Sequence, residues 1–261
     1  MKDAPSEMRD FAELVKANRV EAIKDIVETY NSEVDEEGMK ELPCDLCHGK
    51  GRIEIFNEEK QDREQIECKC MKARRALRFV TNLGLLKDVQ KCSFESYEPY
   101  DDATRDMKQA ALDYSNNFED RWLFLGGQSG AGKTHLAYSI FGKMVKRSIA
   151  PVWMRWIQDS QDLKMIIGED DYDREVKRLQ TASVLIIDDF FSLTPTEADI
   201  RLARVIIDHR YTNKLPTIIT TELTLGEIDN YDDAIAGRIA EMSVVYQIGG
   251  KNHNYRMRNF R

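Results

Sequence analysis

The sequence contains no apolar run near the roughly 18 residues that a membrane-spanning helix needs, and its opening stretch, MKDAPSEMRDF, has no apolar signal core. We therefore expect no membrane partner and a cytoplasmic location. An unexported chain stays in a reducing compartment, so its five cysteines are expected to be thiols or metal ligands rather than disulfides. An excess of positive charge is also missing. Because the net charge is −8, binding to nucleic acid requires a local basic patch.

The length of 261 residues allows one large domain or two modest domains. Two parts of the chain, 1–90 and 91–261, differ in pattern, and we expect each to form a domain. Before residue 31, apolar residues recur at helical spacing between charges, which predicts one or two amphipathic helices. The polar stretch 31–40 is interpreted as a linker.

From about residue 91, apolar runs alternate with amphipathic stretches. Near-continuous apolar runs are typical of buried parallel strands. The alternation predicts an α/β fold class, in which helices flank both faces of a parallel sheet. The expected strands are 122–125, 152–156, 184–187, 217–221 and 244–248, and the expected helices are 133–146, 173–180, 197–211 and 232–242.

The stretch GQSGAGKT, residues 127–134, matches the phosphate-binding pattern GxxxxGK[ST] between an expected strand and an expected helix. Its glycines let backbone N–H groups close around phosphate oxygens, and the helix N-terminus adds a favourable dipole. We expect Lys133 to reach the β- and γ-phosphates of ATP and Thr134 to ligate Mg²⁺. A glycine-rich turn before a helix is the alternative. The residues expected to contact the nucleotide are Gly127, Gln128, Ser129, Gly130, Ala131, Gly132, Lys133, Thr134 and His135.

Two carboxylates, Asp188 and Asp189, follow the apolar run VLII, at the strand end where ligands bind in open α/β sheets. Asp188 is expected to hold Mg²⁺, directly or through water, and Asp189 to orient or deprotonate the attacking water. The alternative is an exposed acidic turn after a buried strand. Many ATPases have Glu where Asp189 stands, and the shorter side chain points to slow hydrolysis.

Four more polar residues near the end of the chain are candidates for contact with the γ-phosphate. Thr221 or Glu222 ends a third expected strand and is expected to approach the attacking water, with an ordinary strand end as the alternative. Arg238 and Arg256 are candidates for stabilising transition-state charge, because a guanidinium spans several phosphate oxygens. Solvation is the alternative for either arginine.

Four cysteines form two close pairs, CDLC at 44–47 and CKC at 68–70. The residues between the pairs alternate as in a hairpin, which brings four thiolates together around a tetrahedral zinc ion. The run CxxCH also matches a c-type haem attachment signal, but the missing export signal and the CKC pair argue against haem. Four unrelated buried thiols are the other alternative, and Cys92 is expected to be a small core residue. The expected Zn²⁺ ligands are Cys44, Cys47, Cys68 and Cys70.

Two further groups of side chains allow both a structural and a functional interpretation. Trp153, Arg155 and Trp156 suggest base stacking, but their place in an expected strand favours burial in the core. The other group contacts DNA phosphate or is simply solvated. It is the basic cluster Lys69, Lys72, Arg74, Arg75 and Arg78.

A family resemblance is carried by five stretches of the chain. They are SFESY (93–97), GQSGAGKTHLA (127–137), LIIDDF (185–190), IIDHRYTNKLPTIITTEL (206–223) and GRIAEM…NYRMR (237–258). Together they resemble the AAA+ ATPase core of bacterial replicative-helicase loaders, the DnaC/DnaI-like group, and of their relatives, the IstB-like transposition helpers. The resemblance covers about residues 93–261, and such loaders often carry a zinc module before the ATPase.

The resemblance implies an AAA+ P-loop NTPase core and roles for two arginines. The family residue matching Arg238 is an arginine finger that reaches a neighbouring subunit's ATP, so a homo-oligomer through AAA+ interfaces is implied. The residue matching Arg256 is the sensor-2 residue of the same subunit, and no separate C-terminal lid is expected after it. One position departs from the family, which usually has Asn where this chain has Glu222. A carboxylate beside the γ-phosphate is repulsive unless it is protonated or turned away.

The resulting prediction is an ATPase that loads a hexameric replicative helicase onto single-stranded DNA. ATP binding assembles the protomers, and hydrolysis releases the loader. In the family the N-terminal region docks on the helicase, and a self-packed helical cap is the alternative for residues before 31. The runner-up is an IstB-like ATPase that assists a transposase. The third reading, suggested by Asp189 and Glu222, is a nucleotide-gated adaptor that hardly hydrolyses ATP.

Overall fold

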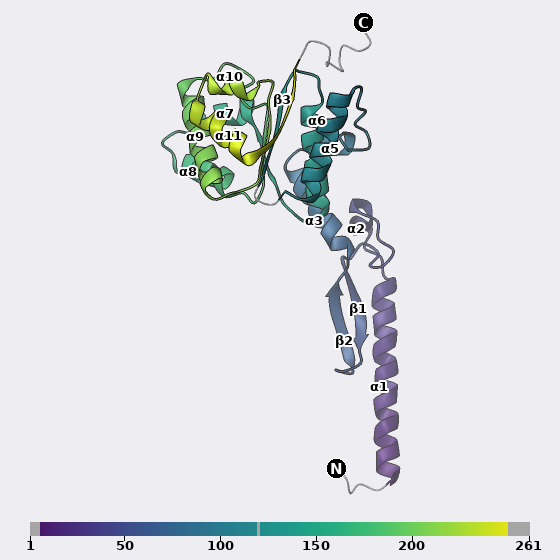
Figure 1. Ribbon diagram of the computed structural model, residues 1–261. Coiled ribbons are helices and arrows are strands. Elements are labelled where there is room, and N and C mark those ends of the chain that lie inside the picture. Colours follow the sequence, from purple (N-terminus) through teal and green to yellow (C-terminus); the bar gives the residue numbers. More distant parts are fainter. Residues whose placement is uncertain (1–5, 119–120, 250–261) are drawn as a thin grey trace. The chain divides into compact units, whose positions relative to one another are not determined.

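The computed structural model describes residues 6–118 and 121–249 of the chain (Figure 1). Its internal contacts divide the chain into two compact units, Met1–Arg78 and Phe79–Arg261. The division falls within helix α3 (Cys70–Asn82), whereas the sequence suggested a boundary after residue 90. Among the described helices, none combines the length and the apolarity that a bilayer crossing requires.

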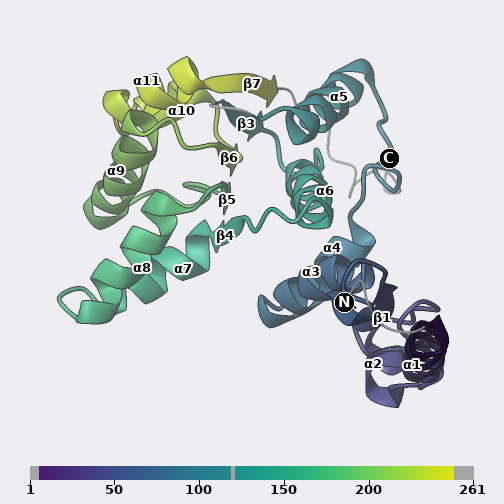
Figure 2. The same ribbon diagram turned by 90° about the horizontal axis from the view of Figure 1, so that it is seen from below.

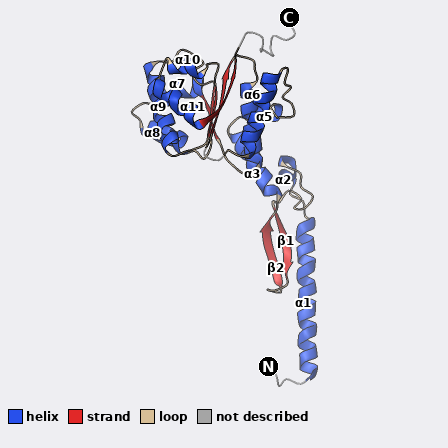
Figure 3. Ribbon diagram, viewed as in Figure 1, coloured by secondary structure: helices blue, strands red, loops and turns tan. Residues whose placement is uncertain are grey.

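The first unit is built on one continuous helix, α1 (Ser6–Ser32), and an antiparallel hairpin, β1 (Arg52–Asn57) and β2 (Asp62–Glu67) (Figure 3). The last turn of α1 is attached to the hairpin through Asn31. The side-chain nitrogen of Asn31 donates to the backbone carbonyl of Glu54 at 2.8 Å, and its side-chain oxygen accepts from the backbone N–H of Glu54 at 3.0 Å. The side chain thus pairs with the strand edge as a neighbouring strand would. The expected hairpin is present.

A short helix, α2 (Glu36–Glu41), lies in the stretch that was expected to be a linker. The side chain of Asp35 accepts from the amide of Gly38 at 3.2 Å and so caps the helix. Gly38 lies directly against the cysteine-bearing turn, since a Cβ there would be 2.1 Å from the carbonyl oxygen of Gly49. The linker prediction is therefore wrong, because a side-chain cap and a close backbone contact order this polar stretch.

The second unit contains a five-stranded parallel sheet in the order β4-β5-β6-β3-β7. All four neighbouring pairs are parallel, so each connection crosses over through helices. The predicted fold class, a parallel sheet flanked by helices, is confirmed. The strands are β3 (Trp122–Gly127), β4 (Val152–Arg155), β5 (Leu185–Asp188), β6 (Thr217–Thr220) and β7 (Ser243–Ile248).

Helices cover both faces of this sheet, with α5 and α6 on one face and α7 to α11 on the other (Figures 1 and 2). Buried strand residues such as Phe124 and Ile187 share one apolar core with α9 and α11. Trp153 and Trp156 are 7% and 4% exposed, which confirms that both belong to the core. The helices are α4 (Leu86–Lys91), α5 (Asp102–Asn116), α6 (Lys133–Lys146), α7 (Trp156–Met165), α8 (Asp170–Thr181), α9 (Glu197–Thr212), α10 (Leu225–Asp229) and α11 (Asp233–Met242).

A buried arginine stabilises the end of the sheet away from the P-loop. Arg210 on α9 is fully buried, and its Nε donates to the hydroxyl of Thr217 at 2.8 Å. Its other nitrogens donate to backbone carbonyls, including those of Ala182 and Pro216. Burial lowers the pKa of Arg210 to about 10, so the guanidinium stays charged at neutral pH. The guanidinium donates to backbone carbonyls in the segments just before β5 and β6, and these hydrogen bonds hold the starts of the two strands in place.

Candidate functional site

A cavity of about 540 Å³ lies where β3, β5 and β6 end. The loop between β3 and α6 forms one wall, and Asp189 and Glu222 contribute from the ends of β5 and β6. A turn formed by residues 92–100 lines another wall. Seven of the nine residues expected to contact a nucleotide line this cavity: Ser129, Gly130, Ala131, Gly132, Lys133, Thr134 and His135.

The other two residues, Gly127 and Gln128, hold the start of the loop against the segment that follows β6 and the end of β7. The amide of Gly127 donates to the carbonyl of Leu223, and the amide of Gln128 donates to that of Ile248 at 2.9 Å. Gly127 has φ +96°, and a Cβ there would lie 2.2 Å from the carbonyl oxygen of Ile248. Only glycine allows this approach, so Gly127 sets where the loop leaves the sheet.

Gly132 fits the loop against Tyr97, a residue that was not among the expected site residues. Gly132 has φ +85°, and a Cβ there would lie 2.4 Å from the Tyr97 ring. The Tyr97 hydroxyl donates to the carbonyl of Ala131 at 2.8 Å, and burial raises the pKa of Tyr97. Tyr97 therefore remains a neutral donor that holds the phosphate loop in shape.

His135, which was expected to contact the nucleotide, also ties α6 to the turn that carries Tyr97. Its Nε2 lies 2.9 Å from the carbonyl oxygen of Ser93 and 3.3 Å from the hydroxyl of Ser96. Because a carbonyl can only accept, Nε2 carries a proton. The imidazole also meets the Tyr97 ring edge-on, with 5.4 Å between the ring centroids.

Lys133 lies inside the curve of the loop. Its ammonium donates to the carbonyls of Gly127 and Gln128, at 2.8 Å each. These two hydrogen bonds keep the Lys133 ammonium inside the loop, where it would contact a bound phosphate chain.

Thr134 and Asp188 are brought together as a magnesium site requires. The Thr134 hydroxyl donates to Oδ1 of Asp188 at 2.9 Å. Asp188 is 6% exposed, and burial raises its pKa. A second hydroxyl, that of Thr220, donates to the same Oδ1 at 2.5 Å. Thr220 was not among the expected site residues. Hydroxyl and carboxylate oxygens are the ligands that Mg²⁺ prefers, so these residues fit the ion.

Asp189 and Glu222 both line the cavity, whereas Thr221 does not. The Thr221 hydroxyl donates to the carbonyl of Phe190 at 2.6 Å and is fully buried. The expectation that Thr221 or Glu222 approaches the γ-phosphate therefore narrows to Glu222.

Of the two predicted arginines, the structure describes Arg238, and Arg238 is not among the described residues that line the cavity. Arg238 on α11 lies 3.1 Å from a carboxylate oxygen of Asp208 on α9, with its guanidinium over the ring of Tyr211. Arg256 lies outside the described residues, as does the chain after it, where no lid was expected.

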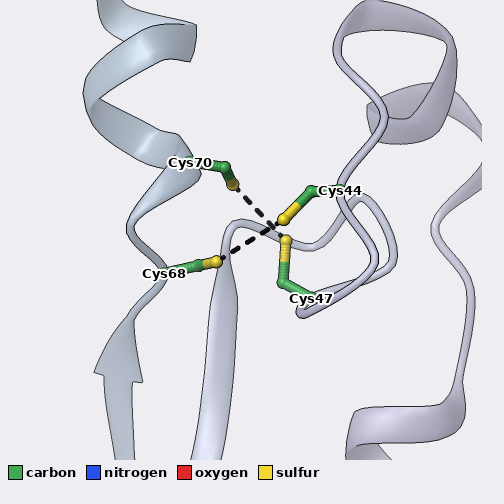
Figure 4. Close-up of side chains that lie close together, drawn as sticks. All are labelled: Cys44, Cys47, Cys68 and Cys70. Atoms are coloured by element: carbon green, nitrogen blue, oxygen red, sulfur yellow. Dashed lines mark hydrogen bonds between the residues drawn. The ribbon is translucent and has the colours of Figure 1, made fainter.

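The four predicted zinc ligands converge (Figure 4). All four sulfur atoms lie within 4.8 Å of one another. The Cys44–Cys68 and Cys47–Cys70 sulfurs are 3.8 and 3.5 Å apart. A tetrahedral ion with Zn–S bonds of about 2.3 Å requires sulfur separations of about 3.8 Å, so the four thiols fit Zn²⁺.

The surroundings of the cysteines also suit a charged metal centre. The amide of Gly51 donates to the sulfur of Cys47 at 3.3 Å. Arg74 on α3 is 2% exposed and donates to the carboxylate of Glu41 and the carbonyl of Leu42. The basic cluster is thus partly internal: Glu41 also accepts from Arg78, and the paired guanidiniums lower the pKa of Glu41 to about 2.

These features define a P-loop protein with an AAA+-type fold, in which a phosphate loop and a buried aspartate meet at the ends of parallel strands. The family model of the IstB-like ATP-binding protein matches residues 55–261, which is most of the chain. The chain therefore belongs to the family of IstB-like ATP-binding proteins. ATP binding follows from this membership.

Individual proteins resemble the chain over shorter stretches. YqaM of Bacillus subtilis (strain 168) is 26% identical over 190 residues, which cover 67% of this chain and 60% of YqaM. A protein of insertion sequence IS232 from Bacillus thuringiensis subsp. berliner is 31% identical over 156 residues, 56% of this chain and 62% of that protein. The chain thus spans less than two thirds of the length of either relative.

Among solved structures, the DnaC helicase loader superposes with a TM-score of 0.54 at 24% sequence identity. The match covers 62% of this chain and 99% of the DnaC chain. At this identity, the likeness concerns the fold.

Proposed function

We propose that the chain is an ATP-dependent loader that binds a hexameric replicative helicase and single-stranded DNA. One observation carries the proposal: an AAA+ core is joined to a separate N-terminal module whose long helix leaves apolar side chains uncovered. Leu14, Val15 and Ile26 on α1 are 59%, 51% and 47% exposed. A helix of this length gains most of its stability from tertiary packing of an apolar face. A partner protein would supply that packing.

In the proposed cycle, the cavity of the second unit binds ATP. Lys133 turns from the loop carbonyls to the phosphates, while Thr134 and Asp188 hold Mg²⁺. The ion neutralises charge on the phosphate oxygens when it is bound. Asp189 orients the attacking water from the end of β5. With Asp189 in place of the longer Glu and with Glu222 nearby, we expect slow turnover that DNA or the partner stimulates.

Self-association is proposed to use Arg238. Its guanidinium does not line the cavity of its own chain and lies on the α9–α11 surface, 29% exposed. Such a position suits a residue that completes a neighbouring protomer's site. In the proposed assembly, Arg238 leaves Asp208 for the neighbour's phosphates, and Arg256 acts on the nucleotide of its own chain.

Zinc is proposed to hold the N-terminal module together. Among the side chains described between residues 13 and 78, the only buried hydrophobic ones are those of Cys47 and Cys68. A module without an apolar core requires another source of folding free energy, and four thiolates on zinc provide it. This module, residues 1–90 in the proposed division, would then present α1 to the helicase.

The second candidate function is assistance to a transposase, in which DNA and a transposase replace the helicase. The family model and the IS232 relative favour it. A nucleotide-gated adaptor with negligible hydrolysis is the third candidate, and the two cavity carboxylates Asp189 and Glu222 favour it.

A binding and turnover experiment with the full chain separates these functions. The tagged chain is incubated with ATP and either the replicative helicase or a transposase of the organism that encodes it, and ATP turnover is measured with and without single-stranded DNA. A loader retains the helicase, and DNA raises its turnover. Retention of the transposase alone favours the second candidate. Nucleotide-dependent retention with no turnover favours the adaptor.

A further inference from the structure

Thr220 is the last residue of β6, and its hydroxyl connects the carboxylate of Asp188, at the end of β5, to the backbone of Asp189. It donates to Oδ1 of Asp188 at 2.5 Å and accepts from the backbone amide of Asp189 at 3.1 Å. One hydroxyl has one proton to donate and lone pairs to accept. The hydroxyl therefore uses its proton on Asp188 and a lone pair on Asp189, the next residue.

The bond to Asp188 determines which of its oxygens is available to a metal. Thr134 and Thr220 both donate to Oδ1, so Oδ2 is the oxygen that these two bonds leave for an ion. Thr220 is fully buried, so water does not replace its hydroxyl if the hydroxyl is removed. The carboxylate of Asp188 would then lose one of the two bonds that fix its rotation.

The bond to Asp189 supports a strained backbone. Asp189 has φ +56°, in the left-handed region of backbone conformation that residues other than glycine rarely adopt. Its amide donates to Thr220, and its carbonyl accepts from the hydroxyl of Ser192 at 2.8 Å. These two bonds keep the residue in a conformation that directs its side chain to the cavity.

We propose that Thr220 is a positioning residue that couples Mg²⁺ binding at Asp188 to the orientation of Asp189. It acts through the two aspartates and need not touch the nucleotide. The inference rests on the proposed binding of MgATP in this cavity and is independent of the partner protein.

The test uses the full chain and a fluorescent ATP analogue, titrated with MgCl₂ and, separately, without metal. Thr220→Val keeps the shape of the side chain and removes the hydroxyl. We expect the half-saturating Mg²⁺ concentration to rise about tenfold, as for a charged group that loses one hydrogen bond. The affinity for the metal-free analogue should stay within about twofold of wild type, because the phosphate loop is unchanged. ATP turnover at saturating Mg²⁺ should also fall, because the backbone amide of Asp189 loses the hydroxyl to which it donates and the side chain of Asp189 is then less well oriented.

Two further variants distinguish positioning from general stability. Thr220→Ser restores the hydroxyl and should restore the Mg²⁺ dependence. Thr217→Val removes a buried hydroxyl from the other end of β6, where it bonds to Arg210. It should lower the unfolding temperature and leave the Mg²⁺ half-saturation unchanged. If Thr220→Val does not fold, Thr220→Ala carries the same expectation.

A wild-type Mg²⁺ half-saturation in Thr220→Val, or a Thr220→Ser variant as impaired as Thr220→Val, would overturn the inference. These results differ from a failure of the proposed ATPase function, in which the wild-type chain itself would not bind MgATP.

Discussion

The nucleotide cavity and the cysteine cluster are assembled in opposite ways. The cavity takes its residues from strand ends that are far apart in the sequence, and the three strands that end at it, β3, β5 and β6, are buried along their whole length. The cysteine cluster takes its residues from 44–70, beside a hairpin with few buried side chains. A packed core therefore holds the cavity, whereas zinc bound by the four cysteines is proposed to hold the first unit. The two sites should respond independently to metal removal and to mutation.

Loss of the zinc ligands should have the largest effect. In Cys44→Ser/Cys68→Ser, we expect the metal to be absent and the β1–β2 hairpin to lose its protection from hydrogen exchange, because structural zinc contributes about 10–16 kcal/mol to such modules. ATP binding in the second unit should persist. Metal analysis and amide exchange measure both results.

Cys92→Ser is the matched control for the zinc ligands, since Cys92 lies outside the cluster and should leave the metal in place. Retention of hairpin protection in the metal-free double variant would mean that the first unit is held by something other than zinc.

The converse experiment removes the proposed magnesium ligand. Asp188→Ala should lower ATP turnover at least about a hundredfold, because the metal supplies several kcal/mol of charge stabilisation. The zinc content should be unchanged, because the cluster does not depend on the cavity. Turnover equal to wild type would show that Asp188 does not hold the catalytic metal.

Substitutions at two glycines test how much the close contact between the phosphate loop and Tyr97 contributes to stability. Gly132→Ala should lower the free energy of unfolding by about 2–4 kcal/mol, since it combines left-handed strain with a clash against Tyr97. Gly168→Ala has similar strain, at φ +93°, in open space and should cost only about 1 kcal/mol. Chemical denaturation measures both. Equal losses would mean that the Tyr97 contact contributes nothing.

The smallest effect is expected at the Arg238 ion pair, outside both sites. Asp208→Asn should change the free energy of unfolding by less than about 1 kcal/mol, because the pair is partly exposed. It should strengthen nucleotide-dependent self-association about two- to fivefold. Arg238 would no longer have to break an ion pair with Asp208 before it reaches the phosphates of the neighbouring protomer. Sedimentation with a non-hydrolysable ATP analogue measures this, with Arg238→Ala as the non-associating control. Unchanged association in Asp208→Asn would argue against a holding role for Asp208.

Much of the second unit was predictable because its signals are local. The phosphate loop, the α6 bounds and the apolar run before Asp188 each follow from adjacent residues. The cysteine spacing likewise predicted that four thiols would meet. These patterns need no knowledge of how distant segments pair.

Other features depend on pairing that the sequence does not reveal. Which threonine of β6 meets Asp188 is set by the β5–β6 register, in which Ile187 faces Ile219. The contact of Tyr97 with Gly132 requires a turn without periodicity to fold back on the loop. Trp156 looked like the end of a strand, but Asp159 accepts from the amide of Arg155 and starts α7 there. In each case a tertiary or capping contact overrides the local pattern.

The most direct test of the loader proposal measures delivery of the replicative helicase to closed circular single-stranded DNA. The full chain, the helicase and ATP are combined, and loaded helicase is scored by displacement of an annealed strand. We predict ATP-dependent displacement that Lys133→Ala abolishes, with loss in Cys44→Ser/Cys68→Ser despite intact ATP binding. Displacement that is equal with and without the chain would contradict a loading function.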